Sequence, residues 1–204
     1  MSDVAIADVL RGLGLAGAAA ERARAALEAA GITNSRKTRI ADGKLERARA
    51  AIDERFGRFC AACAQRTDPD GREMVVVPAA ACTRCGGSNT SRALTELLEE
   101  CARADLRRLV VVGGSPDTRR ELKALEPSLE FRLVDGTERR TRAEAQRDLA
   151  WADLVVIGGS SELGHKVSNL YTRERSGTPV ITASRRGVEA IAAAVVEHLR
   201  RRAG

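Results

Sequence analysis

Leu109-Val-Val-Val-Gly-Gly-Ser-Pro116 is the stretch that decides the fold, because four apolar residues end abruptly at a glycine-rich turn. The same pattern returns at Leu154-Val-Val-Ile157, which is followed by Gly158-Gly-Ser-Ser161. A short, continuous apolar run between turns is typical of a strand that is buried on both faces of a parallel sheet. Both runs are therefore predicted to be buried strands.

Strands and helices alternate on either side of these two runs. Weaker strands are predicted at residues 131–134 and 179–182, and helices at residues 91–104, 117–125, 142–151, 162–173 and 188–202. Such alternation predicts a parallel sheet, and the right-handed crossover rule favours the strand order 2-1-3-4. Residues 91–204 are thus predicted to form an α/β domain, with a four-stranded Rossmann-like or flavodoxin-like sheet and helices on both faces.

In this order the first and third strands are neighbours, and their carboxyl ends form the crevice where open sheets bind ligands. Both ends carry Gly-Gly-Ser, and a histidine and a lysine fall in the first turns of the helix after the third strand. Glycines allow close backbone approach, and free N–H groups at a helix start attract anions. The candidate residues for a phosphate or nucleotide ligand are Gly113, Gly114, Ser115, Gly159, Ser160, Ser161, His165 and Lys166. Alternatively, the glycines only reverse the chain and His165 is structural.

Two cysteine pairs, Cys60-Ala-Ala-Cys63 and Cys82-Thr-Arg-Cys85, precede this domain. Their spacing is typical of a four-thiolate zinc site, because two residues between cysteines form a tight turn that brings both sulfurs to one ion. Residues 60–90 resemble a zinc ribbon, and the resemblance implies one structural Zn²⁺ per chain. The alternative is four reduced thiols without metal.

The first 59 residues are predicted to be helical, with the third helix inferred from Leu45, Ala48, Ile52, Phe56 and Phe59 at three- and four-residue steps.

Between the second and third helices, residues 31–40 loosely resemble the turn and second helix of a helix-turn-helix. In that interpretation Arg36, Lys37 and Arg39 contact nucleic acid, although Lys37 sits where such motifs usually bury an apolar residue. The alternative is a solvated basic loop.

Composition narrows the class of partner. A net charge of +6 and a pI of about 9.5 favour an anionic partner, whereas 2% aromatic residues argue against rows of bases stacked on aromatic rings. The amino terminus shows no signal peptide, and no apolar run approaches the ~20 residues that span a membrane. Five cysteines, four of them paired as C-x-x-C, suit a reducing cytoplasm, and Cys101 is expected to pack in a core. A cytoplasmic protein without a membrane partner is expected.

Residues 109–194 resemble a bacterial protein family of unknown function. The resemblance rests on Gly113-Gly114 after the first strand, Asp135-Gly136 after the second, His165-Lys166 after the third, and Gly177-Thr-Pro179 before the fourth. The serine that usually precedes the histidine is Gly164 here. The resemblance implies a Rossmann-like fold and carries no known activity.

These features predict a zinc-containing, nucleic-acid-binding protein whose C-terminal module binds a phosphate-bearing ligand or mediates assembly, as an oligomer or part of a larger complex. One alternative is an enzyme that acts on a nucleotide or nucleic acid in the crevice. Only Asp135 lies at a predicted strand end, with Asp117 and Glu162 nearby, so no catalytic residue is designated. A second alternative is a scaffold subunit with a structural zinc and no ligand.

Overall fold

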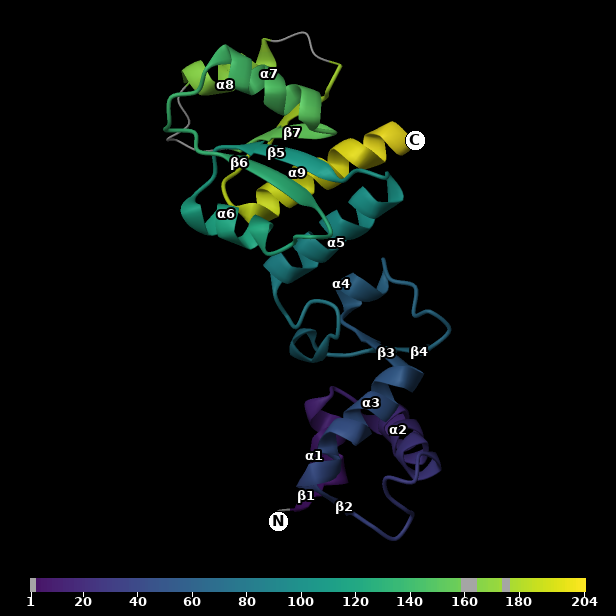
Figure 1. Cartoon of the computed structure of the whole chain (residues 1–204). Helices are drawn as coiled ribbons and strands as arrows, with labels where there is room; N and C mark the ends of the chain where they lie inside the picture. The colour runs from purple at the N-terminus through teal and green to yellow at the C-terminus, as the bar shows by residue number, and fades with distance from the viewer. Residues whose placement is uncertain (1–2, 159–164, 174–176) are drawn as a thin grey trace. The chain divides into compact units, whose positions relative to one another are not determined.

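The computed structural model describes residues 3–158, 165–173 and 177–204. The chain divides into two compact units, Met1–Arg92 and Ala93–Gly204, and the division falls inside helix α5 (Asn89–Arg103). Figure 1 shows the helices and strands of both units. Within the described ranges, no helix has the length and apolarity needed to cross a membrane.

The second unit contains a four-stranded parallel sheet in the order β6-β5-β7-β8. Its strands are β5 (Arg108–Val112), β6 (Glu130–Val134), β7 (Leu154–Ile157) and β8 (Val180–Thr182). The predicted α/β class and the predicted order 2-1-3-4 are confirmed. Strands β5 and β7, which contain the two continuous apolar runs, lie side by side at the centre of the sheet.

Helices cover both faces of this sheet because the side chains of a strand alternate between its faces. Val110, Val112 and Val155 pack with α7 (Arg142–Trp151) and α8 (His165–Thr172). Leu109 and Val111 pack instead with residues of α5, α6 (Pro116–Lys123) and α9 (Val188–Ala203). Figure 1 shows the two helical layers on opposite sides of the sheet.

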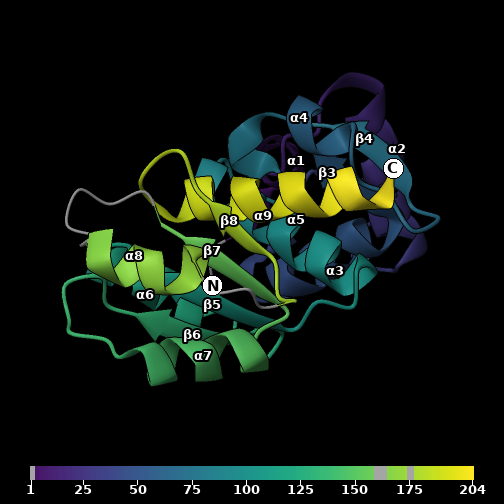
Figure 2. The same cartoon turned by 90° about the horizontal axis from the view of Figure 1, so that it is seen from above.

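Ion pairs also join helices α5 and α9. Arg200 of α9 lies 2.7 Å from Glu96 and 2.9 Å from Glu100 of α5, and Glu100 is buried. Figure 2 shows the two helices running beside one another. The C-terminal helix is therefore held to the sheet layer by apolar contacts and by a partly buried ion-pair network.

The first unit is built from short elements. In chain order they are β1 (Asp3–Ala5), α1 (Ile6–Gly12), α2 (Gly17–Ala29), β2 (Arg39–Ala41), the 3-10 helix η1 (Asp42–Lys44), α3 (Leu45–Arg55), β3 (Phe56–Phe59), α4 (Ala61–Ala64), β4 (Glu73–Val76) and the 3-10 helix η2 (Ala79–Ala81). Its core contains Ile6, Leu27, Ala48, Ile52 and Phe56. The helical faces of α1, α2 and α3 thus meet around one apolar cluster.

The predicted third helix is too long. Helix α3 ends at Arg55, and Phe56–Phe59 form β3, which pairs in parallel with β4. All four residues of β3 are buried, with Phe56 in the helical core and Phe59 among the cysteines. An extended backbone reaches both places, and the helical spacing of the two phenylalanines was coincidental.

Residues 31–40 do not form the helix that a helix-turn-helix motif requires. Helix α2 ends at Ala29, the chain turns through Gly31 at φ +66°, and Arg39–Ala41 pair antiparallel with β1. Ile40 is buried from this strand, which accounts for the apolar residue in an otherwise basic segment. The segment is a turn and an edge strand, so the second half of the helix-turn-helix prediction is wrong.

Candidate functional site

The four predicted metal ligands come together. The Sγ atoms of Cys60, Cys63, Cys82 and Cys85 all lie within 4.8 Å of one another, and the side chains are buried and free of disulfides. The Cys60 and Cys85 sulfurs are 3.8 Å apart. Tetrahedral zinc with Zn–S bonds of about 2.3 Å places its sulfurs about 3.8 Å apart. The donor set and its spacing are therefore compatible with zinc.

Each pair sits on a backbone turn that aims its two sulfurs inward. Cys60 follows β3 directly, and its carbonyl accepts hydrogen bonds from the N–H groups of Cys63 and Ala64 at 3.0 and 2.9 Å. The Cys82 carbonyl accepts from Gly86 N–H at 2.9 Å. Gly86 and Gly87 have φ of +53° and +85°, a left-handed conformation that glycine adopts without steric cost. The first turn is instead the short helix α4, so it needs no glycine.

Burial and backbone N–H groups shift the pKa values of the four thiols in opposite directions. Burial raises the pKa of Cys63 and Cys85 and favours their neutral forms. Burial acts the same way at Cys82, but the N–H groups of Cys60, Cys85 and Arg84 outweigh it and lower the pKa to about 6. The N–H of Cys63 lowers the pKa of Cys60. At Cys60 and Cys82 the backbone N–H groups therefore favour the thiolate, the form that binds metal.

Arg58 ties this cluster to the helices of the same unit. Its buried guanidinium donates to Asp53 Oδ1 at 2.7 Å and to the carbonyls of Leu13 and Ala81 at 3.1 Å each. Its own carbonyl accepts from the N–H and the hydroxyl of Thr83, inside the second cysteine pair. Sequence reasoning missed Arg58, because it resembles any other arginine of a chain rich in that residue.

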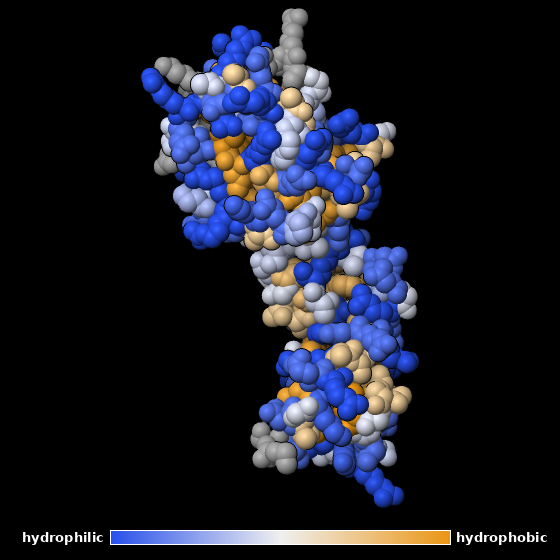
Figure 3. Space-filling model, viewed as in Figure 1, coloured by the Kyte–Doolittle hydropathy of each residue, from blue (hydrophilic) through white to orange (hydrophobic). Residues whose placement is uncertain are grey.

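The predicted nucleic-acid residues Arg36, Lys37 and Arg39 gather around one hollow of about 370 Å³. Lys44 lines the same hollow and was not predicted. Arg36 and Lys37 are exposed, and no carboxylate pairs with either side chain in the part of the chain that the structure describes. In Figure 3 the loop before β2 is coloured as strongly hydrophilic. This segment therefore presents cationic charge that its own unit does not neutralise.

At the carboxyl end of the sheet, the residues that directly follow β5 and β7 lie close together, as the predicted strand order requires. A Cβ atom on Gly158 would lie 3.3 Å from the Gly114 nitrogen, so the first residue after β7 packs directly against the backbone of the turn after β5. Gly113 and Gly114 have φ of +92° and +83°. Gly159, Ser160 and Ser161 lie outside the described residues. His165 and Lys166 begin α8, and the structure describes only their backbone.

Two polar groups at this end are already engaged. The Ser115 hydroxyl accepts from Thr118 N–H at 3.2 Å and caps α6. The Asp135 carboxylate accepts from Thr137 and pairs with Arg119 at 2.9 Å. The Thr137 N–H is the largest cause that lowers the pKa of Asp135, and Arg119 adds to it. Ser115 and Asp135 therefore shape the turns, and Asp135 is a poor candidate for a catalytic base.

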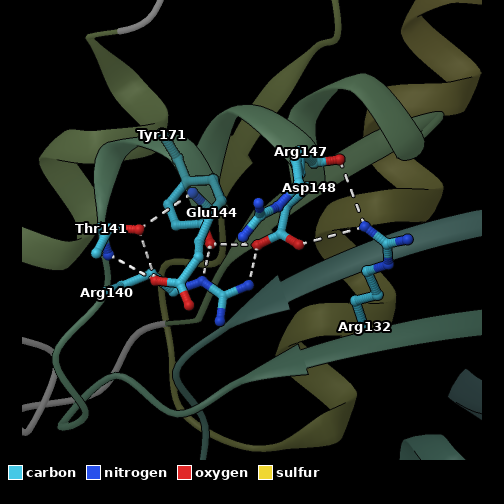
Figure 4. Close-up of polar contacts among 7 residues, drawn as sticks. All are labelled: Arg132, Arg140, Thr141, Glu144, Arg147, Asp148 and Tyr171. Carbon is cyan, nitrogen blue, oxygen red and sulfur yellow. Dashed lines mark hydrogen bonds and ion pairs between the residues drawn. The ribbon is translucent and has the colours of Figure 1, made fainter.

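A second polar cluster, also missed from the sequence, lies beneath α8 (Figure 4). Asp148 of α7 is buried and accepts from the Tyr171 hydroxyl at 2.7 Å and from Arg140. Arg140 also donates to Tyr171 Oη at 2.9 Å. Arg132 of β6 approaches the other Asp148 oxygen at 3.5 Å and lies over the Trp151 ring at 4.2 Å. The network fixes α8 against α7 and so positions the helix on which His165 and Lys166 lie.

These two arrangements, a four-cysteine cluster and a basic hollow in one unit, are the strongest candidates for function. Comparison of the chain with protein-family models, curated proteins and solved structures finds no match.

Proposed function

We propose that this protein binds nucleic acid through the basic segment of its first unit, which one structural zinc ion stabilises. We also propose that the α/β unit holds a phosphate-bearing ligand or mediates assembly, and that the protein works in the cytoplasm. Its five cysteines are all free thiols, as in a reducing compartment.

The distribution of ion pairs carries the nucleic-acid proposal. Six arginines of the first unit lie within 4.0 Å of a carboxylate: Arg11, Arg22, Arg24, Arg49, Arg58 and Arg72. The cations around the hollow differ, because Arg39 and Lys44 donate to main-chain carbonyls and Arg36 and Lys37 extend into solvent. Uncompensated cations concentrated in one place favour a polyanionic partner.

The shape of the segment favours phosphate contacts over base reading. A recognition helix inserts into the major groove and presents side chains to base edges. Residues 31–40 form a turn and a strand. Because phosphates lie on the outside of any nucleic acid, a basic turn can reach them without entering a groove. We therefore expect weak sequence preference and strong salt dependence.

The proposed zinc is structural because four thiolates complete a tetrahedral shell. The cysteines are also joined to the rest of the unit by β3 and by Arg58, so the ion would hold together the framework that carries the basic segment.

The test is a titration of labelled single- and double-stranded DNA and RNA by fluorescence anisotropy at several salt concentrations. Arg36→Ala with Lys37→Ala should weaken binding roughly tenfold at low salt and reduce the salt slope by about two. The matched control is Arg47→Ala with Arg55→Ala, which removes the same charge from two exposed arginines of α3. Absence of binding by the unaltered protein at low salt would sink the proposal, and equal losses in both double variants would assign binding to net charge alone.

The close approach of Gly158 to the Gly114 backbone supports the second part of the proposal, because it brings together the carboxyl ends of β5 and β7, where open sheets bind ligands. A thermal-shift screen of nucleotides tests it. A nucleotide that stabilises the protein should lose most of its effect in Lys166→Ala. Identical melting with every nucleotide would favour the assembly role, which size-exclusion chromatography with light scattering measures.

A further inference from the structure

We infer that residues 32–44 form a preformed site for a single phosphate group of a nucleic-acid strand, in which Lys44 is a fourth binding cation and Asn34 and Arg24 hold the loop in shape. The inference rests on the proposed function and names the part of the surface that would carry it.

The composition of the hollow indicates an anion. Four cationic residues, Arg36, Lys37, Arg39 and Lys44, line it together with one acidic residue, Asp3. The buried residues Ile32 and Ile40 contribute apolar lining. In a concave surface, cations on the walls can contact the oxygens of one phosphate group from several sides. A flat basic patch can contact them from one side only.

Two of the cations are held in place without losing their charge. Arg39 Nη2 donates to the Asp3 carbonyl, and Lys44 Nζ lies 3.5 Å from the Ile32 carbonyl. Carbonyl oxygens are neutral, so these contacts orient the side chains and leave the positive charge available to a ligand. Lys44 comes from η1, beyond the strand, and this explains why the basic run at residues 36–39 did not reveal it.

The loop that carries the other two cations is ordered by hydrogen bonds to its main chain. Asn34 Oδ1 accepts from the N–H groups of Arg36 and Lys37 at 3.1 Å each. Arg24 of α2 donates to the carbonyls of Ser35 and Lys37 at 3.3 and 2.8 Å. The Thr38 carbonyl accepts from Ile6 N–H at 2.9 Å. Because these bonds already hold the loop in one shape, binding does not need to order it, and affinity gains accordingly.

The probe is a short single-stranded DNA labelled at its 3′ end, prepared with either a 5′-phosphate or a 5′-hydroxyl. Lys44→Ala should weaken binding roughly tenfold and lower the salt slope by about one. Lys123→Ala is the matched control, since Lys123 is an exposed lysine of the other unit. Tighter binding of the 5′-phosphate form would identify a terminal phosphate, and equal binding would identify an internal phosphodiester.

The Asn34→Ala variant tests whether the shape of the loop, and not only its charge, contributes to binding. It removes no charge, so it should weaken binding about threefold to tenfold while the salt slope stays unchanged. Asn34→Ser, which keeps a side-chain oxygen acceptor, should recover part of the loss. Melting curves verify that each variant is folded. If Lys44→Ala and Asn34→Ala bind like the unaltered protein while Arg36→Ala with Lys37→Ala does not, the hollow is rejected and nucleic-acid binding stands. If the unaltered protein binds no oligonucleotide, both proposals fail.

Discussion

The α/β unit and the cysteine segment (residues 56–88) differ in the side chains that fill their interiors. In the α/β unit, apolar residues pack on both faces of the sheet, with Leu109, Val111, Leu154 and Val156 on one face and Val110, Val112 and Val155 on the other. Around the cysteines, the buried cluster is Phe59 with the four thiols, and Ala64 packs against it.

This difference indicates where each region obtains its stability. Burial of apolar surface suffices for a sheet with two helical layers. Apart from Phe56 and Val77, which pack in the helical core, residues 56–88 bury one aromatic ring and four thiols. A structural metal supplies the stability that such segments lack in apolar surface. We therefore expect the cysteine segment to depend on metal and the α/β unit to be independent of it.

The largest effect should come from Cys82→Ser. Loss of one thiolate should abolish zinc retention and unfold residues 56–88, because metal binding and folding of such a segment are coupled, with binding energies of about 10–16 kcal/mol in zinc-finger peptides. Hydrogen exchange should show lost protection in β3 and kept protection in β5 and β7. Cys101→Ala is the control. This cysteine is buried in the apolar core of the α/β unit, and its loss should cost about 1 kcal/mol without loss of metal. Retained protection in β3 after Cys82→Ser would contradict the contrast.

The next largest effect should come from removing the buried carboxylate of Asp148 in the α/β unit. Asp148→Ala removes a buried acceptor of hydrogen bonds from Tyr171 and Arg140, so unfolding free energy should fall by about 2–3 kcal/mol in urea titrations. Tyr171→Phe should cost only about 1–2 kcal/mol. The exposed pair Arg120–Asp117 supplies the control, and Asp117→Ala should change stability by less than about 0.5 kcal/mol. Equal effects for Asp148→Ala and Asp117→Ala would show that the Asp148 network contributes no special stability.

A smaller effect should appear in acid. Burial raises the pKa of Glu100, but the guanidiniums of Arg103 and Arg200 outweigh burial and lower the pKa below its usual 4.5. The carboxylate therefore contributes stability at neutral pH, and this contribution is lost as the pH falls from about 4.5 through the folded-state pKa. Glu100→Gln should cost about 1–3 kcal/mol at pH 7 and progressively less below pH 4.5 in urea titrations. A difference that stays constant with pH would contradict this account of α5 and α9.

The sheet could be predicted because its strands carry the signal locally. Leu109–Val112 and Leu154–Ile157 are continuous apolar runs with glycine turns, and both facts are visible without knowing any partner. The cysteine cluster could be found for the same reason, since the ligand spacing encodes the turn.

Features that depend on distant partners could not be found. Phe56 and Phe59 fit a helical repeat, and only the pairing of β3 with β4 makes them a strand. Arg58 and Asp148 acquire their roles from Ala81 and Tyr171, which are remote in sequence. The basic segment was recognised by its charge, but its strand pairing with β1 and its completion by Lys44 depend on the fold.

Metal analysis of the freshly purified chain tests the central claim most directly. Elemental analysis, paired with hydrogen exchange before and after a chelator, should find one zinc per chain. Removing the metal should expose β3 and β4 while β5, β6 and β7 stay protected. Substantially less than one zinc per chain, in protein whose β3 and β4 are fully protected, would contradict the claim that metal holds this segment together.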